Sequence, residues 1–111
     1  MTVEEANKID SPMWDRAKTK MILLIADHLD WKENEGEHLF LLQSKLNAYL
    51  DYIESGQLFA TYLWAKGVPI IISVDGKYPL SAEAEKFYTT AKKIVADLGF
   101  SLEFTHSPSR G

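Results

Sequence analysis

The stretch MILLIA at residues 21–26 is the longest uninterrupted apolar run in the chain. Six residues are short for a buried helix, and the run lacks the polar alternation of a strand with one face in water. We therefore predict a strand with both faces covered. Successive side chains of a strand point to opposite faces. The two predicted sets are Met21, Leu23 and Ile25 facing the helices, and Ile22, Leu24 and Ala26 facing away.

The segments on either side predict a hairpin and a long helix. Residues 12–15 form a short first strand in this interpretation, joined to 21–26 by the polar turn 16–19. Residues 38–55 carry apolar side chains at intervals of three and four, and Gly56 follows at a position typical of helix ends. The predicted apolar stripe is Leu39, Leu42, Leu46, Tyr49, Leu50 and Ile53. The predicted solvated face is Gln43, Lys45, Asn47, Asp51 and Glu54.

The second half of the chain repeats the alternation of strand and helix. Residues 58–64 predict a short helix or a turn, and residues 68–74 a strand. Ser81 is the predicted N-cap of a second long helix that Gly99 ends. Its predicted core stripe is Ala84, Phe87, Ala91, Ile94, Val95 and Leu98. Residues 100–105 alternate apolar and polar, which predicts a last strand with one face in water.

These elements predict an α+β fold in the order ββαβαβ. Each helix has one apolar stripe to bury, so a two-layer sandwich follows, with a mixed four-stranded sheet and two helices on one face. With 111 residues the chain has room for a single domain, 1–111. The non-periodic ends, at about 1–9 and 106–111, are predicted to be mobile.

Composition argues against several classes of function. The chain has no cysteine, which excludes disulfides, thiolate metal sites and a cysteine nucleophile. A formal net charge of −4 opposes nucleic-acid binding, and no apolar run is long enough for a membrane span. The N-terminus shows no secretory signal, so we expect a cytoplasmic protein. The six glycines are isolated, so no phosphate or dinucleotide loop is present and we expect no cofactor.

Residues 27–38 gather the polar side chains best suited to chemistry. The candidates for a metal site are His28, Asp30, Glu37 and His38, because imidazole and carboxylate groups are common ligands. Their spacing is not diagnostic, and we favour a structural role in which Asp27 and Asp30 shape the turn and His38 begins the helix. Asp27 and His28 are neighbours in an extended strand and point apart, which disfavours a shared acid–base role. We therefore predict no catalytic and no metal residues.

Several short motifs together resemble a family of short, uncharacterised bacterial proteins. They are DHLDW at 27–31, EHL at 37–39, LQSKLNAYL at 42–50, YIESG at 52–56 and KYP at 77–79. The resemblance covers about residues 7–104 and implies bacterial origin, a small α+β domain and no assigned activity. Members of that family have a proline-bearing turn where this chain has YLWA at 62–65, so Leu63 and Trp64 are predicted to belong to this protein's own surface.

Two hypotheses of function remain. The first is a non-catalytic module that binds a protein partner or forms a homodimer through the sheet face opposite the helices, with Ile22, Leu24 and Ile71 at the interface. The alternative is a metal-dependent or hydrolytic enzyme that uses the segment from Asp27 to His38. We favour the first, because a monomer rarely leaves such an apolar face in water.

Overall fold

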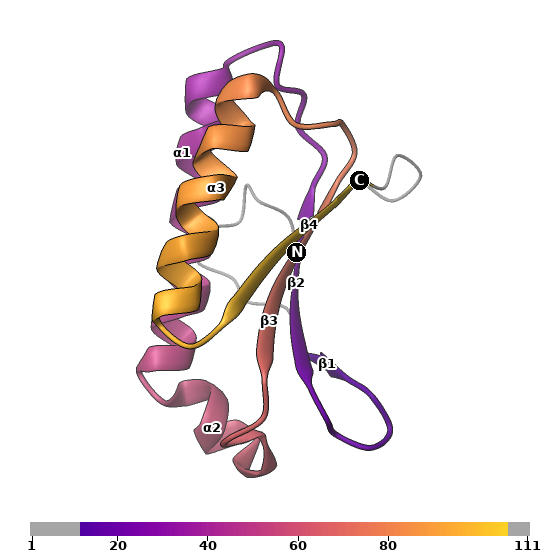
Figure 1. The fold of residues 1–111 in the computed structure, drawn as a ribbon, viewed down its shortest axis with the longest axis vertical. Helices are drawn as coiled ribbons and strands as arrows, with labels where there is room; N and C mark the ends of the chain where they lie inside the picture. Colours follow the sequence, from indigo (N-terminus) through magenta and orange to yellow (C-terminus); the bar gives the residue numbers. More distant parts are fainter. Residues whose placement is uncertain (1–11, 107–111) are drawn as a thin grey trace.

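The computed structural model describes residues 12–106, which form a four-stranded sheet with the long helices on one face (Figure 1). The elements are β1 (Met13–Trp14), β2 (Met21–Asp27), α1 (Glu35–Glu54), α2 (Gln57–Thr61), the 3-10 helix η1 (Leu63–Ala65), β3 (Ile70–Gly76), α3 (Ala82–Asp97) and β4 (Ser101–His106). The predicted α+β class and element order are confirmed. The expectation of mobile ends falls outside the described residues, except at His106, which ends β4.

The sheet order follows the chain order, β1-β2-β3-β4. β1 pairs antiparallel with β2, whereas β2, β3 and β4 are parallel, so the sheet is mixed as predicted. Parallel neighbours need a return crossing between them, and α1 and α3 make these crossings side by side on the same face (Figure 1). Both helices therefore run in the same direction. Within residues 12–106, no helix is long and apolar enough to cross a membrane.

The core lies between the sheet and the two long helices. Met21, Leu23 and Ile25 of β2 are fully buried, which confirms the predicted inner face of this strand, and Ile72 and Val74 of β3 are fully buried as well. α1 contributes Leu42, Leu46, Tyr49 and Ile53 from its predicted stripe. Both predicted helix ends are also confirmed: Gly56 and Gly99 have φ of 88° and 94°, a conformation that costs glycine little. The Ser81 side chain accepts a hydrogen bond from the Ala84 amide at 3.1 Å.

The predicted stripe of α3 is partly wrong. Tyr88 is buried, whereas Ile94 and Leu98 are 52% and 40% exposed and Phe87 is half-buried. The residues that face the sheet are Ala84, Tyr88, Ala91 and Val95. Two small alanines let this face approach the sheet closely, and the Tyr88 ring lies 5.3 Å from that of Phe104 on β4. Hydrophobicity alone favoured the larger apolar residues, but Phe87 and Ile94 lie toward α1, where they line a pocket with Leu46 and Leu50.

Two details of α1 also differ from prediction. The helix begins at Glu35, three residues before His38, and follows Asn34, whose φ is 51°. Lys45, predicted on the solvated face, has no exposed surface. Its ammonium nitrogen lies 5.4 Å from the centre of the Tyr49 ring, so the charge sits against an aromatic face. The long aliphatic part of lysine makes such burial compatible with the apolar interior.

Candidate functional site

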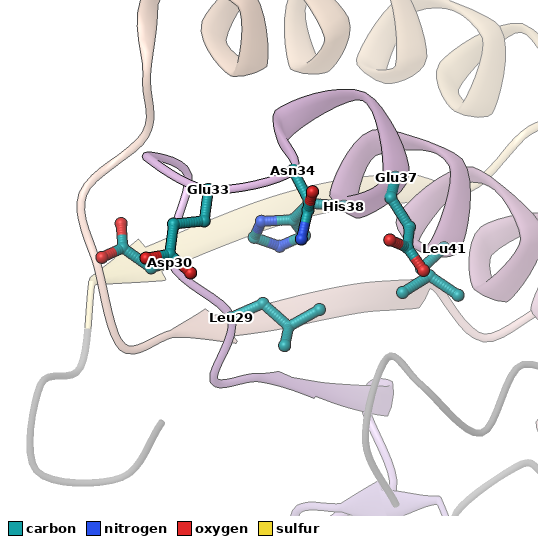
Figure 2. Close-up of a pocket in the computed structure, with 7 residues that line it drawn as sticks. All are labelled: Leu29, Asp30, Glu33, Asn34, Glu37, His38 and Leu41. Carbon is teal, nitrogen blue, oxygen red and sulfur yellow. The ribbon is translucent and has the colours of Figure 1, made fainter.

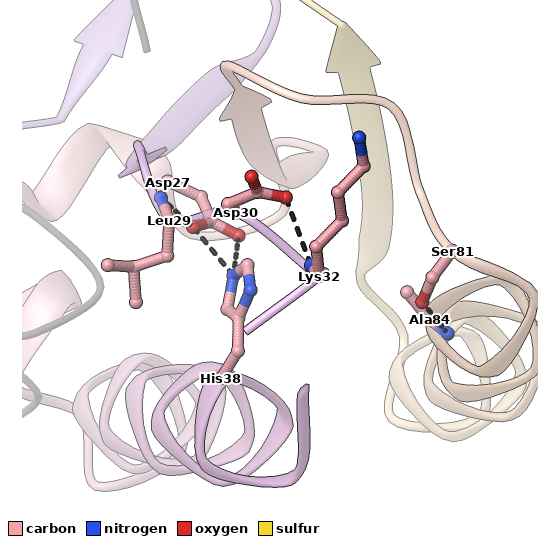
Figure 3. A network of polar contacts seen from close by, with 7 residues as sticks. All are labelled: Asp27, Leu29, Asp30, Lys32, His38, Ser81 and Ala84. Carbon is pink, nitrogen blue, oxygen red and sulfur yellow. Dashed lines mark hydrogen bonds and ion pairs between the residues drawn. The ribbon is translucent and has the colours of Figure 1, made fainter. Parts of the chain in front are cut away.

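The carboxyl end of β2 and the start of α1 bring an acid and an imidazole into contact. Asp27 is the last residue of β2 and lies on the same face as Leu23 and Ile25, which are turned toward the helices. His38 lies at the start of α1. The Nε2 atom of His38 is 2.6 and 2.8 Å from the two carboxylate oxygens of Asp27 (Figure 3). Both side chains are only 2% exposed.

The loop between them folds back over the pair. Trp31 stacks on His38, with ring centres 3.5 Å apart and planes 16° from parallel. Asp27 accepts a hydrogen bond from the Leu29 amide at 3.2 Å, and Asp30 accepts one from the Lys32 amide at 3.0 Å (Figure 3). The predicted turn-shaping roles of Asp27 and Asp30 are confirmed. The contact with His38 therefore ties this loop to α1.

The environment of the pair limits its chemistry. A carboxylate only accepts hydrogen bonds, so Nε2 of His38 is the donor, and a neutral ring then holds its lone pair at Nδ1. Nδ1 is buried and has no hydrogen-bond partner within residues 12–106. The buried Tyr88 hydroxyl also has no hydrogen-bond partner within residues 12–106. Burial, together with the negative charge of Asp27, raises the pKa of Tyr88. Nε2 of His38 is therefore occupied by Asp27, and Nδ1 is withdrawn from the surface.

A pocket of about 250 Å³ lies beside the pair (Figure 2). It is lined by Leu29, Asp30, Glu33, Asn34, Glu37, His38 and Leu41. In Figure 2, the Asp30 and Glu33 carboxylates lie at one end and the Glu37 carboxylate at the other, with the imidazole between them. The acidic groups surround the pocket without converging on one point.

The four candidate ligands predicted from sequence are only partly brought together. Asp30, Glu37 and His38 line the same pocket, but His28 is not among its lining residues. Within the described part of the chain, no three histidine, aspartate or glutamate side chains are arranged to hold a metal ion. Sequence reasoning missed Asp27 as the partner of His38. The available signal was alternation, because it places Asp27 on the same strand face as Ile25.

The outer face of the sheet carries a second candidate surface. The strand register places Met13, Ile22 and Ile71 in one row across β1, β2 and β3, on the face opposite α1 and α3 (Figure 1). Leu24 lies in the next row, paired with Ser73. Ile22, Leu24 and Ile71 are half-buried and Met13 is 47% exposed. We call Met13, Ile22, Leu24 and Ile71 the outer apolar patch; Met13 is the member that sequence reasoning missed.

A comparison with models of protein families shows which family this chain belongs to. The model of a family of unknown function, DUF6572, matches residues 1–108. The chain belongs to the DUF6572 family. The predicted resemblance to an uncharacterised family is therefore confirmed, while bacterial origin stays a prediction. No curated protein and no solved structure gives a significant match, so membership of DUF6572 brings no activity to transfer.

Proposed function

We propose that this DUF6572 chain is a non-catalytic protein-binding module that pairs with a second copy of itself through the outer apolar patch. The single observation that carries the proposal is the row of Met13, Ile22 and Ile71 across three strands, on the sheet face that α1 and α3 leave open. Apolar side chains gathered on such a face lose contact with water when a partner covers them.

The surroundings of the patch suit an interface between identical copies. Toward β4 the same face becomes polar, because the row of Leu24 continues with Ser73 and Glu103, and Thr105 lies in the next row. An apolar centre beside a polar rim is the usual anatomy of a protein interface. A twofold axis uses one patch for both subunits, which makes a homodimer the simplest arrangement.

The alternative, a metal-dependent or hydrolytic enzyme, has less support. His38 directs Nε2 at Asp27 and buries Nδ1, so its imidazole is not presented to a substrate. His28 is not among the residues that line the pocket with Asp30 and Glu37. We therefore assign the Asp27–His38 pair a structural role. A cytoplasmic location and the lack of nucleic-acid partners remain expectations from composition.

The test is the mass of the protein in solution, measured by light scattering and sedimentation velocity. We expect a dimer at micromolar concentration and a folded monomer for Leu24→Glu, because a charge in the patch opposes its burial. Thr105→Glu is the matched control, since it adds the same charge to a polar row of the same face and should leave the dimer intact. If the Leu24→Glu protein does not fold, the Met13→Glu variant is used instead, because Met13 is the more exposed residue of the patch. A monomeric unmodified protein overturns the proposal.

A further inference from the structure

Helix α3 carries a second apolar stripe that does not face the sheet. Phe87, Ala91, Ile94 and Leu98 follow one another at intervals of four, three and four residues. Of these, only Ala91 also belongs to the face that packs on the sheet. Ile94 and Leu98 are 52% and 40% exposed. This spacing is typical of a helix surface that packs against another helix.

Phe87, Ala91 and Ile94 of this stripe line a groove between α1 and α3, which lie next to each other in Figure 1, and Leu98 follows at the C-cap of α3. The groove has a volume of about 270 Å³. Buried Leu46, Ala91 and Val95 form its floor, and Leu50, Phe87 and Ile94 form its sides. Along α1 it extends from Gln43 to Leu50, which at about 1.5 Å per residue is about 12 Å, or two helical turns. Its shape and length suit a short amphipathic helix.

The charges at one end of this groove indicate the chemistry of the occupant. Because α1 and α3 run in the same direction, their carboxyl ends lie at the same end, with Asp51 and Glu54 in the last turn of α1 and Asp97 in that of α3. Neither last turn contains a basic residue. Negative charge there is unfavourable, because it adds to the negative end of both helix dipoles. A bound cation would relieve that repulsion.

Among the described residues, no basic side chain relieves this repulsion. Within residues 12–106, Asp51, Glu54 and Asp97 form no ion pair. Lys93 lies one turn before Asp97 without bridging to it, and Lys86 pairs with Glu83 near the opposite end of α3 at 3.4 Å. The only lysine of α1 is the buried Lys45. The carboxyl end of the groove therefore keeps an acidic character.

We propose that this groove binds an amphipathic helix of a partner protein, with apolar residues at three- and four-residue intervals in the groove and lysine or arginine side chains over Asp51, Glu54 and Asp97. The proposal goes beyond self-association, since the groove is on the side of the molecule away from the outer apolar patch. A dimer joined through the sheets would display two such grooves on its outer sides.

The experiment uses a synthetic helical peptide of about fifteen residues, long enough to span the groove, with leucines at three- and four-residue intervals and lysines near its end. Binding is measured by fluorescence polarisation. We expect saturable binding that weakens with salt and falls at least tenfold for Ile94→Glu and for Asp51→Lys combined with Glu54→Lys. Leu63→Glu is the matched control, because Leu63 is 71% exposed and lies outside the groove. Thr90→Glu, at an exposed residue that also lines the groove, replaces Ile94→Glu where the latter fails to fold.

Two peptide controls and one protein control complete the design. A peptide of the same composition with the leucine spacing scrambled should bind weakly, and so should one with glutamate in place of lysine. Equal binding of the scrambled peptide, or no saturable binding of the designed one, overturns the groove proposal. The Leu24→Glu protein should bind the designed peptide with unchanged affinity. Loss of dimerisation and loss of peptide binding are thus separate results, so either proposal can fail without the other.

Discussion

The buried pair Asp27–His38 predicts that removing one partner is worse than removing both. A hydrogen bond to a charged group contributes about 1.5–3 kcal/mol, and leaving a buried charge without its partner costs about 3–5 kcal/mol. Among residues 12–106, His38→Leu leaves the Asp27 carboxylate, 2% exposed, with the Leu29 amide at 3.2 Å as its one remaining donor. We therefore expect His38→Leu to lower the free energy of unfolding by about 3–5 kcal/mol.

The reciprocal change and the double variant complete the cycle. Asp27→Leu leaves a neutral imidazole with one unpaired buried N–H, which costs about 1–3 kcal/mol. In the variant with both substitutions no polar group of the pair remains buried, so its cost should be smaller than that of His38→Leu alone. Asp30→Leu is the control, because the hydrogen bond that Asp30 accepts from the Lys32 amide is exposed. The expected change there is below about 1 kcal/mol.

The assay is urea denaturation followed by far-ultraviolet circular dichroism. The dependence of the unfolding free energy on urea concentration must be the same for the unmodified protein and every variant, so that the free energies can be compared. A double variant whose cost equals the sum of the two single costs would refute the reasoning. A His38→Leu variant as stable as the Asp30→Leu control would do the same, because it would mean that the Asp27–His38 contact contributes nothing to the fold.

Three further predictions concern the core. Leu46→Ala should cost about 2–5 kcal/mol and Phe87→Ala less, because Leu46 is 4% exposed and Phe87 is half-buried; equal losses in thermal unfolding would contradict this. The pKa of Tyr88 is raised in the folded protein, so above the ordinary tyrosine pKa of 10.0 the hydroxyl loses its proton more readily in the unfolded chain. The free energy of unfolding should therefore fall as the pH rises past that value. Tyr88→Phe should make that fall shallower, by at most about 1.4 kcal/mol per pH unit, and identical pH profiles would count against it. Gly76→Ala should destabilise, because its Cβ would lie 2.5 Å from Cε1 of Phe104, and Phe104→Leu in the same chain should restore part of the loss.

Alternation and helical spacing sufficed for most of the architecture. The inner face of β2, the stripe of α1 and the N-cap at Ser81 depend on local sequence, and each was predicted at its observed position. The rotation of α3 was not predictable in this way. Its two overlapping stripes share Ala91, and the choice between them depends on how α3 packs against both the sheet and α1, which no local pattern specifies.

The candidate site was predictable as a segment but not as a set of contacts. Sequence placed the polar cluster between Asp27 and His38, yet their contact joins a strand end to a helix start across a loop whose path no local pattern specifies. Lys45 was missed for a related reason. Charge predicts exposure, but the structure places its ammonium group over Tyr49, four residues further along the same helix.

The order of strands in the sheet has a consequence for synthesis on the ribosome. The strands are neighbours in the sheet in the same order as in the chain. Each strand is therefore synthesised after the strand with which it first pairs. Domains acquire structure from the N-terminus onward during translation, so β2 and α1 can meet before β3 leaves the ribosome, and β3 can dock before β4 is complete. No strand has to be inserted between two others. A nascent chain halted after α3 should therefore already protect β2 and β3 from proteolysis, with only the place of β4 still open.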